Sequence, residues 1–192
     1  MLYRSYESIF SELGLKFNEE IQNKINLYLD LLFEWNEKTN LTSCSREEFL
    51  EKHFIFSLNF VPLVKDFGII FDFGSGNGVP GIPISLFLPQ KKVFLVENKQ
   101  RKVAFLEYAV GYLKINAIVL NSAYETFDES LDNFCVVSKA FNDFKVMKRF
   151  FRRGVDLFIP LTDENLLKGV KVLAKYSARI GEFSGYFYRL WV

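Results

Sequence analysis

Gly74, Gly76, Gly78 and Gly81 are the residues whose type and spacing suggest chemistry most directly. Because glycine has no Cβ atom, a loop built from it can adopt positive φ angles and lie directly against a flat ligand. A nicotinamide-dinucleotide motif, GxGxxG, would place its third glycine where the chain has Val79, and no Lys-Ser/Thr pair follows to make a phosphate-binding loop. The GxGxG spacing predicts a nucleoside-containing cofactor; a tight strand-to-helix turn without a ligand is the alternative.

Glu97 is the second residue that suggests cofactor binding. It follows an apolar run at residues 92–96, where a carboxylate can accept hydrogen bonds from both ribose hydroxyls of an adenosine. A solvated strand end is the alternative explanation for a glutamate at this position. Because the glycine loop and the acid follow consecutive predicted strands, together they indicate an adenosine-type cofactor.

These residues need a scaffold in which strands alternate with helices. Ile69–Phe73 is a short apolar run that ends in the glycine loop, and helical spacing follows it. The pattern repeats, with strands expected at 92–96, 117–120, 134–138 and 155–159 and helices at 81–88, 99–113 and 143–151. The alternation predicts an α/β fold with a mostly parallel sheet and helices on both faces. Two further runs, 170–176 and 187–192, predict an antiparallel C-terminal hairpin that brings the sheet to seven strands.

The first third of the chain is predicted to be helical. Apolar residues recur at intervals of three and four over residues 18–35, and further helices are expected at 6–13 and 46–58. No linker rich in glycine or serine separates this helical lead, residues 1–66, from the Rossmann-like core at 67–192. We therefore expect 192 residues to form a single domain.

Composition narrows the class of protein. With 49% hydrophobic residues and a formal net charge of +1, the chain can build a core but has no global attraction to nucleic acid, so RNA would have to meet a local basic patch. Cys44 and Cys135 lack the spacing of a zinc or redox motif. The N-terminus has no signal-peptide pattern, and the most apolar stretch, 54–64, is short for a membrane span. We expect a cytoplasmic monomer with no metal and no membrane segment.

Five motifs resemble one known family in their order and spacing. They are WNEKTNLTS from Trp35, KHFIFSL from Lys52, DFGSGNGVPGIPISL from Asp72, LVENKQRKVAFL from Leu95 and VVSKAF from Val136. The similarity, over roughly residues 27–141, is to the RsmG family, also called glucose-inhibited division protein B. These bacterial enzymes methylate guanine N7 in small-subunit ribosomal RNA. The resemblance implies a Rossmann-like class I methyltransferase, with S-adenosylmethionine (S-adenosyl-L-methionine) as cofactor and 16S ribosomal RNA or the small ribosomal subunit as substrate.

The resemblance also implies roles for individual residues. By position, Gly74 and Val79 line the methionine and adenosine moieties, and Glu97 holds the ribose. Lys139 stands where the family has an arginine; lysine keeps the charge but lacks the planar fork that contacts a cofactor carboxylate or an RNA phosphate bidentately. We assign the catalytic role to Lys139. With the loop glycines, the expected cofactor-binding residues are Gly74, Gly76, Gly78, Val79, Glu97, Tyr124, Glu125 and Lys139, the Tyr-Glu pair flanking the adenine.

The implied chemistry needs few acid or base groups. Guanine N7 carries a lone pair and no proton, so it can attack a sulfonium methyl group without a general base, and catalysis reduces to alignment. No Asn/Asp-Pro-Pro-aromatic motif follows the fourth predicted strand, as methylation of an exocyclic amine would require. Cys135, near the start of that strand, could be a nucleophile toward cytosine C5, but a lone cysteine in an apolar run is normally a core residue.

Basic residues supply the candidate RNA contacts. One set lies on the predicted helix at 143–151 or just beyond it and comprises Lys145, Lys148, Arg149, Arg152 and Arg153; a solvated helix face is the alternative. A second set comprises Lys91, Lys92, Lys99, Arg101 and Lys102. Two cationic positions of the family are absent, at Ala123 and within residues 159–162.

His53, the only histidine, is either a hydrogen-bonded packing residue or a contact to the substrate or the cofactor loop. Two other functions stay open beside RNA methylation. They are methylation of a small molecule or a protein, and cofactor binding without catalysis.

Overall fold

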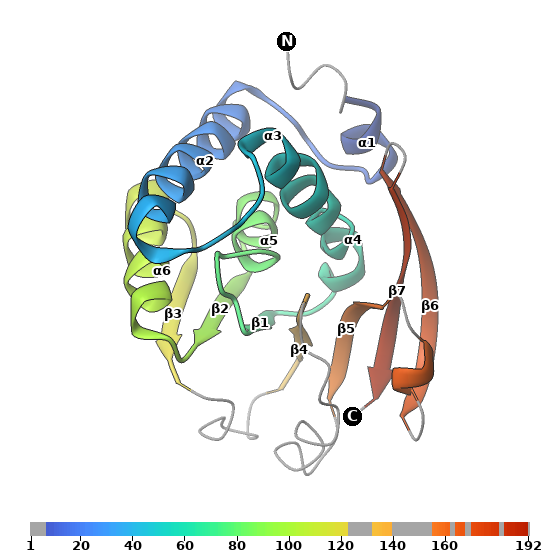
Figure 1. Ribbon diagram of the computed structural model, residues 1–192. Helices are drawn as coiled ribbons and strands as arrows, with labels where there is room; N and C mark the ends of the chain where they lie inside the picture. The colour runs from blue at the N-terminus through green and yellow to red at the C-terminus, as the bar shows by residue number, and fades with distance from the viewer. Residues whose placement is uncertain are drawn as a thin grey trace.

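The chain folds around a seven-stranded sheet in a computed structural model that describes residues 7–122, 132–139, 155–161, 164–167, 170–180 and 183–191 (Figure 1). The strand order is β3-β2-β1-β4-β5-β7-β6. The first five strands pair in parallel, whereas β7 pairs antiparallel with both β5 and β6. The predicted mostly parallel sheet with an antiparallel C-terminal hairpin is therefore confirmed. The strands are β1 Ile69–Phe73, β2 Lys92–Glu97, β3 Ala117–Asn121, β4 Phe134–Val137, β5 Asp156–Leu161, β6 Lys171–Ile180 and β7 Phe183–Trp191.

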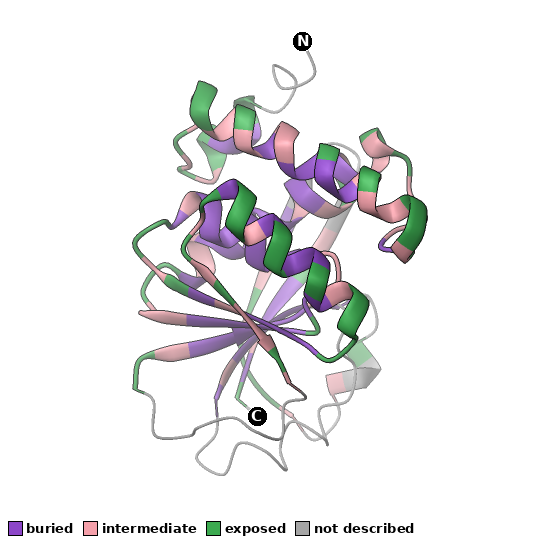
Figure 2. Cartoon of the chain, turned by 90° about the vertical axis from the view of Figure 1, so that its left-hand side faces the viewer, coloured by how far each residue is buried: buried purple, intermediate pink, exposed green. Residues whose placement is uncertain are grey.

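The two faces of the sheet carry separate hydrophobic clusters. Neighbouring residues such as Ile70 and Phe71 belong to different clusters, as the two-residue period of a strand requires. The cluster that contains Ile70 also receives side chains from α5 (Gly81–Phe87) and α6 (Gln100–Leu113), which cover this face (Figures 1 and 2). In the described ranges every α-helix lies on this side. The helix predicted at 143–151 is outside them, so helices on both faces stay a prediction.

The helices of the N-terminal lead pack on α5 and α6 as a third layer (Figure 2). They begin with α1 (Glu7–Glu12) and α2 (Glu19–Thr39). The Asn18 side chain caps α2 by accepting a hydrogen bond of 2.9 Å from the Ile21 amide. The helix ends at Asn40, which has a left-handed φ of 51°. It extends beyond the predicted end at residue 35, because no glycine or proline interrupts it before Asn40.

The helix predicted at 46–58 is only partly an α-helix. α3 covers Arg46–Phe49 and continues directly into a π-helix, Leu50–Ile55, after which α4 covers Phe60–Val64. The predicted helix is therefore present, but hydrophobic spacing over so few residues did not distinguish its wider π-turn from an α-turn. Single π-turns occur frequently at functional sites, and this one carries His53.

Candidate functional site

The glycine loop connects β1 to α5 at the carboxyl edge of the parallel strands. Gly74, Gly76 and Gly78 have φ angles of 72°, 59° and 96°, a region that glycine adopts far more readily than other residues. The amides of Gly74 and Ser75 donate hydrogen bonds of 2.9 and 3.1 Å to the carbonyl oxygen of Val96, in β2. The loop is therefore fixed at the edge where open α/β sheets bind their ligands.

The glycines of the loop divide into two kinds. A Cβ atom added at Gly74 would meet nothing within 4 Å, and one at Gly76 would have only ordinary contacts at 3.6 Å. At Gly78 it would collide with the Ile82 side chain, and at Gly81 with Leu95 and with Asp72. The first two glycines thus leave open space beside the main chain, whereas the other two allow close packing.

Glu97 lies at the end of β2, as expected, and is only 7% exposed. Its Oε2 accepts a hydrogen bond of 3.0 Å from the Gly76 amide, and its Oε1 accepts bonds of 2.9 Å from the amides of Asn98 and Lys99. A carboxylate offers about four acceptor positions, so roughly one is left for a ribose hydroxyl. The side chain also joins the glycine loop to the start of α6, a role that its position in the sequence did not indicate.

The N-terminal helices hold the loop from its other side. The buried Tyr28 hydroxyl on α2 donates a hydrogen bond of 2.6 Å to the carbonyl oxygen of Asn77. The Asn77 side-chain amide in turn donates one of 3.2 Å to the carbonyl oxygen of Leu41. Both contacts join the loop to the helical lead, so this lead takes part in shaping the candidate site.

Asp72 is a feature of the site that our sequence reasoning missed. It is 1% exposed at the end of β1, where its Oδ2 accepts a hydrogen bond of 2.9 Å from the Gly81 amide. Its Oδ1 is buried and, in the part of the chain that the structure describes, has no hydrogen-bond partner. Burial raises the pKa of this carboxyl group to about 7, although the Gly81 amide opposes the rise. The sequence feature that could have identified Asp72 is its position as an acid inside the apolar run Ile69–Phe73.

Lys139 lies at the same edge, two residues after the end of β4. The Ser138 hydroxyl donates a hydrogen bond of 2.9 Å to the carbonyl oxygen of Phe73 and so joins the ends of β4 and β1. The Lys139 amine lies 2.8 Å from Nδ1 of His53 and donates hydrogen bonds of 3.3 and 3.2 Å to the carbonyl oxygens of His53 and Lys52. Burial lowers the pKa of Lys139 to about 7. These contacts direct the amine toward the π-helix.

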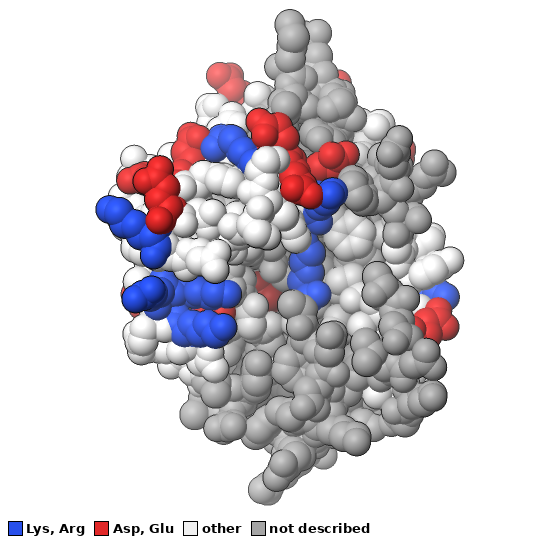
Figure 3. All heavy atoms as spheres, viewed as in Figure 1, with Lys and Arg blue, Asp and Glu red and all other residues white. Residues whose placement is uncertain are grey.

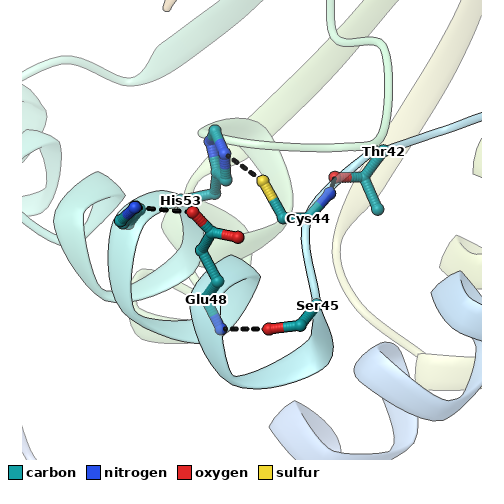
Figure 4. Close-up of polar contacts among 6 residues, drawn as sticks. Thr42, Cys44, Ser45, Glu48 and His53 are labelled. Atoms are coloured by element: carbon teal, nitrogen blue, oxygen red, sulfur yellow. Dashed lines mark hydrogen bonds and ion pairs between the residues drawn. The ribbon is translucent and has the colours of Figure 1, made fainter.

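His53 has a polar neighbour at each ring nitrogen. Its Nε2 lies 3.4 Å from Sγ of Cys44, as Figure 4 shows, and its Nδ1 faces Lys139. The Phe49 ring packs on the imidazole with 5.2 Å between ring centroids. Burial and, next in size, the charge of Lys139 lower the pKa of His53 to about 4, so the ring is neutral at physiological pH. These contacts fit the first alternative, a hydrogen-bonded packing residue, and a contact to the substrate stays a prediction.

Part of the second basic set gathers at the start of α6. Lys99, Arg101 and Lys102 line a hollow of about 440 Å³ together with Gln100 and the end of α2. Figure 3 shows Lys and Arg side chains grouped on this side of the molecule. The Lys102 amine lies 3.6 Å from the place of a Cβ at Gly76, so the hollow adjoins the glycine loop. The other predicted contacts, Tyr124, Glu125, Lys145, Lys148, Arg149, Arg152 and Arg153, and also Ala123, lie outside the described residues.

Cys135 is fully buried in β4, and burial raises the pKa of its thiol well above the usual value. These surroundings support a core residue and oppose its use as a nucleophile. Across the described ranges, no three or more His, Cys, Asp or Glu residues are grouped to hold a metal ion. The same ranges contain no helix with the length and apolar character needed to cross a membrane.

Comparison with protein families gives a match over most of the chain. The model of the family described as GidB, rRNA small subunit methyltransferase G, matches residues 21–175. Proteins named ribosomal RNA small subunit methyltransferase G from Mycoplasma capricolum and Clostridium kluyveri are 37% and 35% identical over 71% and 75% of this chain. The chain spans 60% and 64% of the length of these two relatives. The protein of that name from Aquifex aeolicus is 32% identical over 76% of each chain.

Solved structures support the fold at low sequence identity. A SAM-dependent methyltransferase from Aquifex aeolicus has a TM-score of 0.57 at 15% identity and covers 84% of this chain and 98% of its own. A variant of MtNAS in complex with S-adenosylmethionine has the same TM-score of 0.57, at 15% identity, and covers 88% of this chain and 75% of its own. The sheet described here therefore has the same Rossmann-like fold as these structures.

Proposed function

Because the chain belongs to the family of ribosomal RNA small subunit methyltransferase G, we propose that it transfers a methyl group from S-adenosylmethionine to N7 of a guanine in small-subunit ribosomal RNA. The relatives carry that enzyme's name, and the MtNAS variant of similar fold binds S-adenosylmethionine. The observation that carries the proposal is the glycine loop whose Gly76 amide is held by Glu97 at 3.0 Å beside open space.

The residues at this edge of the sheet fit an adenosine-containing methyl donor. Gly74 and Gly76 leave the main chain uncovered, and Glu97 has an acceptor position left for a ribose hydroxyl. The buried Oδ1 of Asp72 is a further acceptor below the loop. When bound, S-adenosylmethionine supplies an electrophilic sulfonium methyl group. We assign Gly74, Gly76, Gly78, Val79 and Glu97 to its binding, and Tyr124 and Glu125 to the adenine.

The chain's own task is to align the acceptor. Since guanine N7 attacks through a lone pair and loses no proton, the site needs no general base, only a fixed loop and a base held in line with the methyl group. The contacts of Tyr28 and Glu97 fix the loop. We assign the guanine-facing side of the site to Lys139 and the RNA phosphates to the two basic sets. The enzyme acts as a cytoplasmic monomer of one domain, residues 1–66 and 67–192 forming a continuous unit.

Calorimetry and a methyl-transfer assay test the proposal. S-adenosylmethionine and S-adenosylhomocysteine should bind, whereas nicotinamide dinucleotides should not, because Val79 stands where their motif requires glycine. Labelled S-adenosylmethionine is then supplied with naked ribosomal RNA, assembled small subunits or total protein extract, and the labelled RNA base is identified by mass spectrometry. Label in 7-methylguanosine supports the proposal; a full complement of that base in ribosomal RNA from cells lacking the gene would contradict it.

The alternative functions give different outcomes in the same assay. Label in protein or in small molecules indicates methylation of another substrate class. Cofactor binding without any transfer of label indicates a binding module. The observation that favours these alternative functions is the Lys139 side chain. Its amine points toward the π-helix and lacks the planar fork of the family's arginine.

A further inference from the structure

The amine of Lys139 is surrounded by acceptors from one short segment. A protonated lysine has three N–H donors and no acceptor. Three acceptors lie in range, Nδ1 of His53 at 2.8 Å and the carbonyl oxygens of His53 and Lys52 at 3.3 and 3.2 Å. The Phe56 ring adds a cation–π contact, with the amine 5.8 Å from the ring centroid. The position of this amine is therefore set by the π-helix as much as by β4.

These contacts determine which nitrogen of His53 carries the proton. An ammonium group can only donate, so Nδ1 of His53 must accept from it and must itself be unprotonated. In a neutral ring the proton then lies on Nε2, which faces Sγ of Cys44 at 3.4 Å (Figure 4). The sulfur of Cys44 is a weak acceptor and completes the arrangement. Three segments of the chain thus meet in one directed series, from Lys139 through His53 to Cys44.

The imidazole that receives Lys139 is itself held in place. The Phe49 ring packs against it, and Sγ of Cys44 lies 3.4 Å from its Nε2. Turning Nδ1 away from Lys139 would also move Nε2 away from Cys44. The ring can therefore act as an acceptor for the lysine side chain, which has a long flexible stem and loses much conformational entropy when it is held in one position.

We propose that His53 is a positioning residue: its Nδ1 and its carbonyl oxygen hold the Lys139 amine at the carboxyl edge of the sheet, in the ring tautomer whose Nε2–H faces Sγ of Cys44. The inference rests on the proposed function for its consequence, because Lys139 is the residue that the proposed function assigns to the guanine-facing side of the site. An arginine would orient its charge through its own planar guanidinium group. In this chain the acceptors of His53 orient the Lys139 amine instead. By this proposal, a lysine can take the arginine's place at position 139 because His53 fixes the position of its amine.

The first test uses the protein alone and needs no substrate. Because the chain has one histidine, ¹⁵N-imidazole NMR shows a single ring. The measurement is made at pH 6, between the pKa of His53 near 4 and that of Lys139 near 7, with Glu48, Lys52, Cys44 and Asp72 as the other titratable groups facing the pair. The expected state is a neutral ring with its proton on Nε2. A proton on Nδ1 would overturn the inference.

A matched pair of variants shows whether Lys139 selects this tautomer. Lys139→Met keeps the length of the side chain and removes the donor, so a mixture of both tautomers is expected. Lys52→Met serves as the control, because the Lys52 amine pairs with Glu48 and its removal should leave the tautomer unchanged. If the fraction of the Nε2–H tautomer in Lys139→Met equals that in the unchanged protein, Lys139 does not determine the tautomer.

The second test separates positioning from packing. Asn and Leu have nearly the same size, but Asn offers an oxygen near the place of Nδ1. With labelled S-adenosylmethionine and RNA, His53→Asn should keep kcat within about threefold, whereas His53→Leu should lower it roughly tenfold or more with little change in the KM for cofactor. Equal kcat values in the two variants would overturn the positioning role. The NMR measurement tests the contact between Lys139 and His53 even if the unchanged protein transfers no methyl group. Such inactivity would count against the proposed function alone.

Discussion

The hydroxyl of Tyr28 donates a hydrogen bond of 2.6 Å to the carbonyl oxygen of Asn77, across 49 positions of sequence. Tyr28 lies on α2, and Asn77 lies between Gly76 and Gly78 in the glycine loop. This contact makes the helical lead a part of the wall that shapes the loop. A substitution on α2, far along the chain from the loop, should therefore change how the loop binds a ligand.

Tyr28→Phe tests this link. Removing the hydroxyl leaves the Asn77 carbonyl oxygen without its partner, which should lower the free energy of unfolding by about 1 kcal/mol and weaken S-adenosylmethionine binding several-fold. Chemical denaturation and calorimetry measure the two effects. Tyr112→Phe is the control, because that side chain is 53% exposed and its loss should change neither quantity. Unchanged cofactor affinity in Tyr28→Phe would mean that the loop keeps its shape without α2.

The sequence predicted the parts of this site that are close together along the chain and missed the contacts between residues far apart in sequence. The run Ile69–Phe73, the glycines after it and Glu97 are local patterns, and their places at the sheet edge follow from the strand-helix alternation. The contacts of Tyr28 with Asn77 and of Lys139 with His53 join residues 49 and 86 positions apart. No period or spacing encodes such pairs, because they arise only when the layers pack.

The π-helix and Asp72 show a second limit. A π-turn differs from an α-turn by one residue, and an amphipathic pattern over Leu50–Ile55 fits either. Asp72 was visible as the start of the loop, but the rise of its pKa depends on the burial of its carboxyl group from water, which only the folded chain determines. Sequence reasoning thus identified the loop and the strand ends that carry the site, but neither their long-range partners nor the effect of burial on a carboxyl group.

Glu97→Ala should weaken S-adenosylmethionine binding by roughly 1–3 kcal/mol, the range for charge-assisted hydrogen bonds. The loss combines the ribose contact with the bond that holds the Gly76 amide. Glu97→Gln keeps one acceptor oxygen and should lose less. Calorimetry measures both, with Glu107→Ala as the control, since Glu107 is exposed on α6. Affinity equal to that of the unchanged protein in Glu97→Ala would place the cofactor elsewhere.

Two glycine substitutions should separate binding from folding. Gly76→Val puts branches into the open space beside the loop and adds the cost of a positive φ, so it should abolish cofactor binding while lowering stability by only about 1–2 kcal/mol. Gly81→Val drives a side chain into Leu95 and Asp72 and should destabilise the fold itself. Thermal unfolding followed by circular dichroism, paired with calorimetry, distinguishes them. Gly76→Val that binds normally would contradict the assignment of the loop.

Asp72→Asn should change how stability depends on pH. Because burial raises the folded-state pKa of Asp72 to about 7 from 3.8, its contribution is most favourable below pH 3.8 and is lost as the pH rises through 7. Since one pKa unit corresponds to about 1.4 kcal/mol, the stability of Asp72→Asn relative to the unchanged protein should increase by roughly 4 kcal/mol between pH 4 and pH 8. Urea denaturation across this range measures it. Taking the difference between the two proteins cancels the opposite contribution of His53 below pH 6.5. A difference that is independent of pH would show that Asp72 titrates normally.

The RNA surface is the prediction that depends most on residues outside the described ranges. If the basic set on the predicted helix contacts phosphates, replacing Arg149, Arg152 and Arg153 by Ala should weaken binding of small-subunit ribosomal RNA roughly tenfold at low salt. The slope of log affinity against log salt should also flatten by about one for each phosphate that the protein no longer neutralises. Cofactor affinity should not change.

The control for this variant removes the same charge elsewhere. Replacing Lys16, Lys65 and Lys171 by Ala also takes three positive charges away, from exposed positions outside the glycine loop, its Glu97 contact and both basic sets. Because long-range attraction depends on net charge but counterion release depends on local contacts, only the arginine variant should flatten the salt slope. Titration of fluorescent RNA at several salt concentrations measures both variants. Equal slopes in the two would show that the arginines act through net charge alone, and the RNA surface would then have to be sought at Lys99, Arg101 and Lys102 around the hollow beside the loop.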